Sequence, residues 1–501
     1  MLLQLPAHQE SPSPSLNEEI PEADILGISD IRLLDPLQKK LRKRTRHTHI
    51  YCTDPTPCPT EIPFPFPQLQ GSYAFTTNNI SVVLSCGRLA HRTENIHWLT
   101  PPPLLAPPPL SYYALPNHPR PHTIDIIGAG ITGIVTAYVL AQKGFSIRLF
   151  ERHPQPCAEA SGNPHALVYA NLSPFDQIQP RFYQSSLFSA LRYLHNIHTL
   201  QKDVFLPSGI LCTDKHYNQW KNILSPSETA IQRQTEQLWL PHAGVVHPQK
   251  LAQFVLEHPN ISFFPLHNIE NLHQQEDHLV FCAQGTQYTS EHIIICTAHH
   301  IDQFPLLSSL SLHKSSGQIS YQRTPLVDIE HAHSAKAYLT PFWHDVQCFG
   351  ATYHLREEKH TPQKEDHLDN IARLRERFPT LSIDVDTLLG RVGTRAQTNN
   401  FLPIIGPLPD TQWYTEQYAK LKDGLRTSSR YPIAKYVPNI SVHLGHGSKG
   451  FSQAWIGAEI LAAQIQKTPL PIDIDVYQAL HPARFLVKQI HKPSTKNDDI
   501  K

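Results

Sequence analysis

The hydrophobic pattern of the chain is clearest between residues 123 and 152. Apolar residues at 124, 126 and 127 predict a short strand, and the apolar run that follows has the spacing of a helix. A Lys-Gly pair at 143–144 ends this helix, and a second strand is predicted at 146–150. A strand, a helix and a strand in this order predict a βαβ unit.

Three glycines between the first strand and the helix, Gly128, Gly130 and Gly133, have the spacing G-x-G-x-x-G. The first permits a tight turn, the second lets the backbone approach a pyrophosphate, and the third lets the helix pack on the strand. Glu151 follows 18 positions after Gly133, where an acid accepts hydrogen bonds from a ribose hydroxyl. An acid there favours FAD or NAD over NADP. The alternative is a glycine-rich turn in an ordinary α/β core.

Downstream of residue 152, predicted strands and helices mix. Helices are expected at 181–195, 249–257 and 366–378, and strands at 260–266, 278–282 and 293–296. The Ile-rich strand at 293–296 is predicted to close the nucleotide-binding sheet. Runs that start at 316–319 and 337–341 are predicted to begin a second, antiparallel sheet. The expected fold class is α/β, a Rossmann-like domain with an inserted antiparallel-sheet domain.

A second strand–glycine loop–helix is predicted at 441–463, with Gly445, Gly447 and Gly450 in its loop. The free N–H groups of such a loop form a site for an anion or a carbonyl oxygen. Two such loops in one chain suit a large cofactor that is held at both ends.

The first 120 residues are expected to form a poorly defined region. Residues 1–24 are predicted to be disordered, and the Pro-rich segment 101–121 is predicted to be an extended linker. A domain boundary is therefore expected near residue 120. A weakly alternating stretch within 66–89 predicts a β-hairpin. The basic cluster at 38–47 is either a phosphate-binding patch, for instance for RNA, or a solvated charged surface.

Composition narrows the class of protein. Lys plus Arg and Asp plus Glu both number 43, so net charge indicates neither a nucleic-acid nor a membrane partner. The eight cysteines include no C-x-x-C pair, which favours reduced thiols in the cytoplasm. The 32 histidines lack a metal-ligand spacing, so no metal site is expected. Neither a secretory signal nor an apolar run long enough for a bilayer is found. We therefore expect a cytoplasmic protein without a membrane segment.

Two further stretches carry candidate chemistry. Ser161, Gly162 and Asn163 follow the ribose-binding acid and are expected near the cofactor crevice, although a plain surface loop is the alternative. Arg391 and Arg395 flank a glycine beside an apolar strand, and they either bind an anion or are ordinary surface arginines.

Several short motifs recur with the βαβ unit in the order known from one family. They are ASGNP at 160–164, YLTP at 338–341, GATY at 350–353, LPIIG at 402–406, GHGSKG at 445–450 and HPARF at 481–485. With them, residues 121 to about 490 resemble the FAD-dependent oxidoreductase domain of the bifunctional tRNA 5-methylaminomethyl-2-thiouridine biosynthesis proteins. That domain belongs to the D-amino-acid oxidase, glycine oxidase and sarcosine oxidase group.

The resemblance implies FAD as the cofactor. It implies FAD-binding parts at about 121–320 and 390–465, an interleaved substrate part, and a polar tail at 491–501. The residues expected to contact FAD are Gly128, Ala129, Gly130, Ile131, Thr132, Gly133, Glu151, Arg152, Ser161, Gly162, Asn163, Val246, Gly447, Ser448, Lys449 and Gly450.

The resemblance also implies the chemistry. The family oxidises the carbon beside the amine of 5-carboxymethylaminomethyl(-2-thio)uridine at the tRNA wobble position, and the product is 5-aminomethyl(-2-thio)uridine. Arg395, with Arg391 as second choice, is expected to bind the substrate carboxylate. Tyr338 is expected to hold the substrate, and Lys449 to stabilise the reduced flavin. No obligatory acid or base is apparent in the sequence.

The chain departs from the family pattern in two places within this domain. Lys449 stands where the family has Arg, and Asn399-Asn400 replace Arg-Asp. Upstream, the family carries a methyltransferase domain, for which 120 residues are too few. The hairpin at 66–89 is faintly similar to part of it, so we hypothesise a remnant and expect no methyltransferase activity. A separate methyltransferase would then act on the product.

Two other functions stay open on the sequence alone. An oxidase of a small free amine such as glycine or sarcosine would share the fold and the cofactor. The basic cluster also suits a non-catalytic RNA-binding protein.

Overall fold

The computed structural model describes residues 110–491 except 118, 174–176, 214–231, 235–236, 276–277, 356–358, 424–430 and 469, together with the backbone of five short strands upstream. The basic cluster at 38–47, the predicted hairpin at 66–89 and the Pro-rich run at 101–109 lie outside the described side chains. The upstream strands are β1 (Leu2–Leu5), β2 (Ile25–Ile28), β3 (His49–Cys52), β4 (Ala74–Thr76) and β5 (Ile96–Trp98), which pair in that order.

A six-stranded sheet with the order β14-β7-β6-β18-β26-β25 forms the centre of the molecule. All neighbours are parallel except β25 and β26. The strands are β6 (Thr123–Ile127), β7 (Ser146–Phe150), β14 (Ile261–Phe264), β18 (Ile293–Ile295), β25 (Ile404–Pro409) and β26 (Tyr436–Leu444). The predicted βαβ unit and its parallel sheet are therefore confirmed.

The place of β18 in this sheet differs from the prediction. Strand β18 pairs with β6 on one side and with β26 on the other, so it is an interior strand and does not close the sheet. The prediction was wrong because β26 joins from about 140 residues downstream, and a local pattern carries no information on such pairing.

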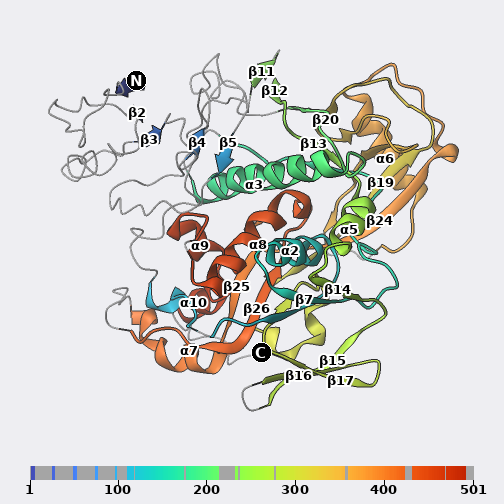
Figure 1. Cartoon of the computed structure of the whole chain (residues 1–501). Helices are drawn as coiled ribbons and strands as arrows, with labels where there is room; N and C mark the ends of the chain where they lie inside the picture. Colours follow the sequence, from blue (N-terminus) through green and yellow to red (C-terminus); the bar gives the residue numbers. More distant parts are fainter. Residues whose placement is uncertain are drawn as a thin grey trace.

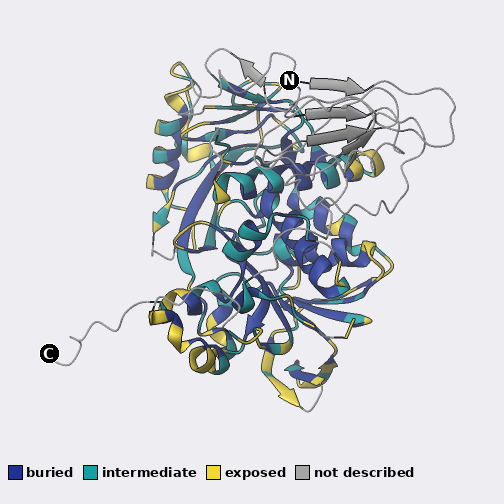
Figure 2. Cartoon of the chain, turned by 90° about the vertical axis from the view of Figure 1, so that its left-hand side faces the viewer, coloured by how far each residue is buried: buried dark blue, intermediate teal, exposed yellow. Residues whose placement is uncertain are grey.

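Four helices lie on one side of the central sheet (Figure 1). They are α2 (Ile131–Gln142), α3 (Ile178–Leu200), α5 (Pro248–Leu256) and α8 (Gly450–Gln466), and α2 packs between α8 and α5. Helices α2, α5 and α8 contact the strands of the sheet, and α3 packs on α8. Helix α2 is apolar on all sides because it is enclosed by the sheet below and by helices around it. Figure 2 shows that buried residues concentrate where these helices meet the sheet.

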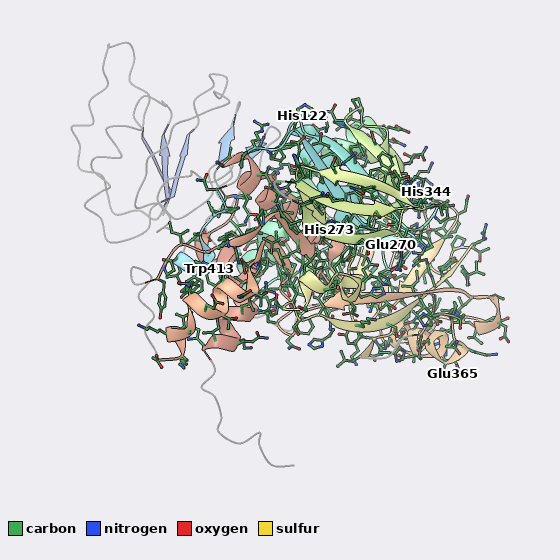
Figure 3. All side chains as sticks on the ribbon, turned by 90° about the horizontal axis from the view of Figure 1, so that it is seen from below. His122, Glu270, His273, His344, Glu365 and Trp413 are labelled. Carbon is green, nitrogen blue, oxygen red and sulfur yellow. The ribbon has the colours of Figure 1, made fainter. Side chains whose placement is uncertain are left out.

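A three-stranded antiparallel sheet covers the opposite face. It consists of β15 (Ile269–Gln275), β16 (His278–Ala283) and β17 (Thr286–Ser290). Leu279 and Phe281 of β16 pack with Phe150 and Ile295 of the central sheet. The other side of β15 is exposed, and Figure 3 shows Glu270 and His273 on this strand.

A second large sheet lies beside the first and has the order β11-β12-β10-β20-β21-β22-β19-β23, with β24 also paired to β19. Most of its pairs are antiparallel, as predicted, and β10–β20 is a parallel exception. Helix α6 (Lys364–Arg375) covers it through Ile371 and Leu374. The strands are β10 (Ile210–Cys212), β11 (Gln232–Gln234), β12 (Gln237–Leu240), β19 (His313–Gln322), β20 (Ala332–Ser334), β21 (Tyr338–Leu339), β22 (Gln347–Gly350), β23 (His354–Leu355) and β24 (Leu389–Gln397).

Smaller elements complete the described fold. A three-stranded sheet has β13 (Gly244–Val246) between β8 (Ala166–Val168) and β9 (Phe205–Leu206). The remaining helices are α7 (Thr411–Gln417), α9 (Ile474–Leu480) and α10 (Arg484–Ile490), and the 3-10 turns are 111–113, 300–303, 305–307, 385–387 and 419–423.

The two large sheets meet at the end of β24. There, Gln397, the last residue of β24, forms a bridge with His446 in the loop after β26, and the N–H of Gly447 donates to the carbonyl of Ala396 at 2.8 Å. The late glycine loop therefore lies at the junction of the two sheets.

A buried ion pair joins α3 to α8 and leads to a stability prediction. The carboxylate of Glu459 accepts hydrogen bonds from Arg192, from Ser189 at 3.0 Å and from Tyr193 at 3.1 Å. Glu459→Ala leaves the Arg192 charge without its partner, so we expect a loss of about 3–5 kcal/mol in the free energy of unfolding.

Denaturant unfolding monitored by circular dichroism measures this loss. The paired variant Arg192→Met/Glu459→Leu removes both charges together and should recover most of the stability. A single variant as stable as the parent would contradict the proposed contribution of the pair.

Candidate cofactor and substrate site

The early glycine turn joins β6 to α2, and two of its glycines are required by the protein itself. Gly128 has φ +100°, and a Cβ there would lie 2.9 Å from the carbonyl oxygen of Cys296. A Cβ on Gly133 would overlap the carbonyl oxygen of Gly128. Both positions therefore exclude any larger residue.

Gly130 is different. It precedes α2 with φ −68° and ψ 179°, which is extended backbone that any residue adopts. A Cβ there would meet only Ser161 Oγ, at 3.4 Å. No described protein atom makes a side chain impossible at Gly130, so the space beside it is open to a ligand. This open cradle at a helix N-terminus fits a pyrophosphate.

Glu151 lies beside this turn at the end of β7. Its carboxylate accepts the N–H of Ala129 at 2.7 Å and the N–H of His153 at 3.0 Å. The same cleft is lined by Gly128, Gly130, Glu151, Arg152 and Ser161. The structure thus brings the predicted ribose acid and the glycine turn into one cleft, in the arrangement that an adenosine diphosphate unit requires.

The loop at 158–163 packs against this turn. Ser161 Oγ accepts the N–H of Ile131 at 3.0 Å, at the start of α2. Gly162 leaves room for Arg391, because a Cβ on Gly162 would contact the guanidinium of Arg391. Arg391 donates a hydrogen bond to the carbonyl of Ala158. Arg391 Nη1 is buried without a hydrogen-bond partner in the described structure. Arg391 is therefore placed on the cofactor side of β24.

An ionic cluster lies at one end of the cleft. Arg152 contacts both Glu159 and His300, and His153 lies 2.9 Å from the Glu159 carboxylate. Burial alone would raise the pKa of Glu159, but hydrogen bonds from His300, His153 and Arg152 outweigh it and hold this pKa well below its usual range. Ligand atoms of Glu159, His299 and His300 lie within 4.8 Å of one another. Because the Arg152 guanidinium already neutralises this cluster, we assign no metal to it.

The first turns of α2 and α8 touch. A Cβ on Gly450 would lie 2.8 Å from a methyl carbon of Ile131. The early and the late glycine loops therefore lie side by side, although more than 300 residues separate them. Their positions allow both loops to contact one large cofactor, as predicted from the sequence. Val246 is fully buried in the core, Thr132 and Asn163 are partly exposed, and Ser448 is exposed.

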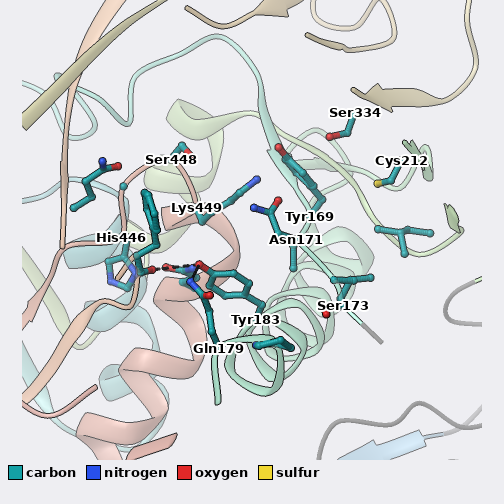
Figure 4. Close-up of a pocket in the computed structure, with 18 of the residues that line it drawn as sticks. Tyr169, Asn171, Ser173, Gln179, Tyr183, Cys212, Ser334, His446, Ser448 and Lys449 are labelled. Atoms are coloured by element: carbon teal, nitrogen blue, oxygen red, sulfur yellow. Dashed lines mark hydrogen bonds between the residues drawn. The ribbon is translucent and has the colours of Figure 1, made fainter. Parts of the chain in front are cut away.

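A cavity of about 770 Å³ opens beside the late loop (Figure 4). Strand β24, the segment 169–173, the start of α3 and the late loop contribute its walls. Lys449 is the one charged residue among its described lining residues. The lining includes Tyr169, Asn171, Ser173, Gln179, Tyr183, Cys212, Ser334, Tyr353, Gln397, Phe401, His446, Ser448 and Lys449.

Lys449 lies against an aromatic ring in this cavity. Its Nζ atom is 3.3 Å from the centroid of the Tyr169 ring, a cation–π contact. Burial alone would raise the pKa of Tyr169, but the charge of Lys449 and its hydrogen bond outweigh this and lower it. The predicted catalytic lysine is therefore fixed at the cavity wall.

Arg395 and Tyr338 are not among the residues that line this cavity, but Tyr169 and Tyr353, which do line it, lie close to Arg395. Tyr338, Tyr353 and Tyr169 are close enough to Arg395 for their ionisation to influence its pKa, which burial lowers. Arg395 Nη1 donates to the carbonyl of Thr352 at 3.4 Å, and no carboxylate pairs with Arg395 in the described part of the chain. An arginine stays protonated in such a site, so the Arg395 side chain carries a positive charge that no described carboxylate balances.

His446 was missed as a site residue although it stands in the predicted late loop. Its Nδ1 lies 3.2 Å from Gln453 Oε1, and its Nε2 is buried without a partner in the described structure. Burial lowers the pKa of His446 to about 4, so the imidazole is neutral at pH 7. Tyr169 and Tyr353 were also missed. Tyr353 ends the GATY motif and Tyr169 follows the ASGNP motif, but only the fold places them near Arg395.

These features define a flavoprotein. Residues 124–464 match the family of FAD dependent oxidoreductases, so the chain belongs to this family and is an FAD-dependent oxidoreductase. This membership sets aside the alternative of a non-catalytic protein.

The chain is similar in sequence to MnmC proteins of the genus Pseudomonas. The chain is 28% identical over 414 residues to the tRNA 5-methylaminomethyl-2-thiouridine biosynthesis bifunctional protein MnmC of Pseudomonas entomophila, covering 77% of this chain and 63% of the relative. The MnmC protein of Pseudomonas aeruginosa is 28% identical over 408 residues, covering 76% of this chain and 62% of that protein. The chain thus spans about three fifths of the length of these relatives.

Solved structures confirm the predicted fold class. Glycine oxidase from Geobacillus kaustophilus is similar with a TM-score of 0.55 and 17% identity, covering 73% of this chain and 99% of that one. L-Proline dehydrogenase from P. horikoshii has a TM-score of 0.56 and 15% identity, covering 74% and 98%. Within the described residues, no helix combines the length and the apolar character that a membrane crossing requires.

Proposed function

We propose that the protein removes the carboxymethyl unit from 5-carboxymethylaminomethyl(-2-thio)uridine at the tRNA wobble position by FAD-dependent oxidation. The product is 5-aminomethyl(-2-thio)uridine, and a separate methyltransferase acts on it. The observation that supports this proposal is Arg395, which has no carboxylate partner in the described part of the chain and lies close to Tyr169 and Tyr353 of a cavity whose described lining has no carboxylate. The similarity to MnmC proteins supports the tRNA substrate.

The protein's own residues bind and orient the substrate in this proposal. Arg395 donates hydrogen bonds to the substrate carboxylate, which supplies its counter-charge. Tyr338 lies near Arg395 and limits how the carboxymethyl group lies. Because no acidic side chain lines the described cavity, nothing there stabilises an ammonium ion, and the neutral amine that oxidation requires is favoured.

FAD supplies the oxidation in the proposed reaction. FAD, when bound, accepts the two electrons and the hydrogen from the carbon beside the amine. Lys449 places a positive charge at the cavity wall, where it stabilises negative charge that develops on reduction. Water then hydrolyses the oxidised C=N bond, releasing the two-carbon unit as an aldehyde acid and leaving the aminomethyl group on the uridine.

The cofactor contacts are proposed for the two glycine loops. The diphosphate lies at Gly128, Ala129, Gly130, Ile131, Thr132 and Gly133, and Glu151 and Arg152 hold the adenosine end. Ser161, Gly162, Asn163 and Val246 contribute to the same grip. Gly447, Ser448, Lys449 and Gly450 hold the flavin ring.

One assay tests the proposal. Purified FAD-loaded protein is mixed anaerobically with tRNA that carries the carboxymethylaminomethyl group, and the flavin absorbance near 450 nm is followed. We expect bleaching together with formation of 5-aminomethyluridine in digested tRNA. Bleaching by glycine or sarcosine but not by this tRNA would instead identify an oxidase of small amines.

A further inference from the structure

The mouth of the substrate cavity carries an exposed aromatic ring in an unusual conformation. Phe401 lines the cavity and is 55% exposed, and its φ is +57°. A bulky residue rarely adopts this left-handed conformation, because its Cβ crowds the backbone. Such strain persists where the surrounding structure enforces it, and often where a residue has a role.

The loop that carries Phe401 is fixed by hydrogen bonds on several sides. Thr398 Oγ1 contacts the carbonyl of Leu402 at 2.7 Å, and Arg484 donates to the same carbonyl at 2.8 Å. Gln179 on α3 donates to the carbonyl of Asn400 at 3.0 Å. The backbone carbonyls of this loop therefore accept hydrogen bonds from other parts of the protein, while the phenyl ring of Phe401 is exposed to solvent.

A second aromatic ring lies on the same wall. Tyr353 lines the cavity and is 44% exposed. Its hydroxyl accepts a hydrogen bond from Gln397, which stands four residues before Phe401 at the end of β24. The hydroxyl is thus anchored while part of the ring stays open at the cavity.

These features suit one kind of partner. Unstacked bases of single-stranded RNA bind aromatic side chains by stacking, and every base offers a flat face for this. An enzyme that acts on a base must take it out of its stack, which leaves neighbouring bases without their partner. The described lining has no carboxylate that would repel phosphates.

We propose that Phe401 and Tyr353 form a stacking rim that holds the nucleotides flanking the target uridine of an RNA loop. This inference rests on the proposed function, because it assumes an RNA substrate. The rim selects a polynucleotide over a free amine by contacts away from the reacting carbon. This chain has Asn399-Asn400 where the family has a charged Arg-Asp pair. In this proposal, stacking supplies the affinity that a charge would otherwise give.

Phe401→Asn tests the rim without straining the loop, because Asn tolerates a positive φ. We expect KM for modified tRNA to rise roughly 5- to 150-fold, the loss typical of one base–aromatic contact. The kcat for tRNA and the kcat/KM for the free nucleoside 5-carboxymethylaminomethyluridine should stay within about twofold. Phe401→Trp keeps a ring and should behave like the parent.

Leu200→Asn is the matched control, since Leu200 is 74% exposed at the end of α3 and does not line the cavity. An unchanged KM for tRNA in Phe401→Asn, or an equal loss with tRNA and free nucleoside, would overturn the stacking rim. A parent enzyme that oxidises only free amines would refute the proposed function first, so the two failures are distinguishable.

Discussion

Arg395→Met is expected to lower kcat/KM for the carboxylated substrate by roughly 30-fold to several-thousand-fold while FAD stays bound. Truncating one partner of a buried, hydrogen-bonded charge pair typically costs about 2–5 kcal/mol, which corresponds to this range. The effect is large because Arg395 has no carboxylate partner in the described part of the chain, so the substrate carboxylate would be its counter-charge. Steady-state oxidation of modified tRNA measures it.

Two controls make the Arg395 result specific. Arg395→Lys keeps the charge but loses the planar fork, so an intermediate loss is expected. The ratio of flavin absorbance to protein absorbance should equal that of the parent in both variants. A variant that keeps full activity would remove Arg395 from the substrate site, and one that loses its flavin would show a structural role instead.

Gly130→Val is expected to abolish FAD retention while the fold stays intact. The backbone of Gly130 is extended, and the nearest protein atom to an added Cβ is Ser161 Oγ at 3.4 Å, so we expect the fold to accept the side chain. The added methyl groups would instead occupy the space in which the diphosphate approaches the backbone. Purified protein should be colourless, with an apoprotein melting temperature within a few degrees of that of the parent apoprotein.

The other glycines of this segment provide the contrast. Gly133→Ala places a Cβ on the carbonyl oxygen of Gly128, so it should destabilise the protein whether or not FAD is present. Gly144→Ala meets no atom within 4 Å and carries only the strain of φ +85°, so it should retain FAD. If Gly130→Val binds FAD like the parent, the cofactor is not seated on this turn.

The sequence predicted those parts of the fold that depend on local pattern. The βαβ unit needs only apolar periodicity and glycine spacing, and α5 and α6 begin and end within three residues of their predicted limits. Strand β18 also pairs with β26, which is distant in the sequence, and no local signal predicts this pairing. The family resemblance supplied the fold class where periodicity could not.

The candidate site was predictable to a lesser degree. Arg391 and Arg395 stand four residues apart on one strand, so the sequence treats them alike. The structure separates them, because Gly162 opens a space for the first and the tyrosines 169, 338 and 353 approach the second. Those tyrosines come from three separate segments, and only tertiary packing brings them around one guanidinium.

The contact between Gly450 and Ile131 has a consequence for biosynthesis. A ribosome makes the chain from its amino end, so the diphosphate turn emerges long before α8 exists to pack against it. Until β26 follows, β18 also presents an unpaired edge, and the second of the two proposed cofactor loops is missing. We therefore expect the finished polypeptide to capture the coenzyme, and a message truncated before codon 436 should yield a product that lacks β26 and stays colourless.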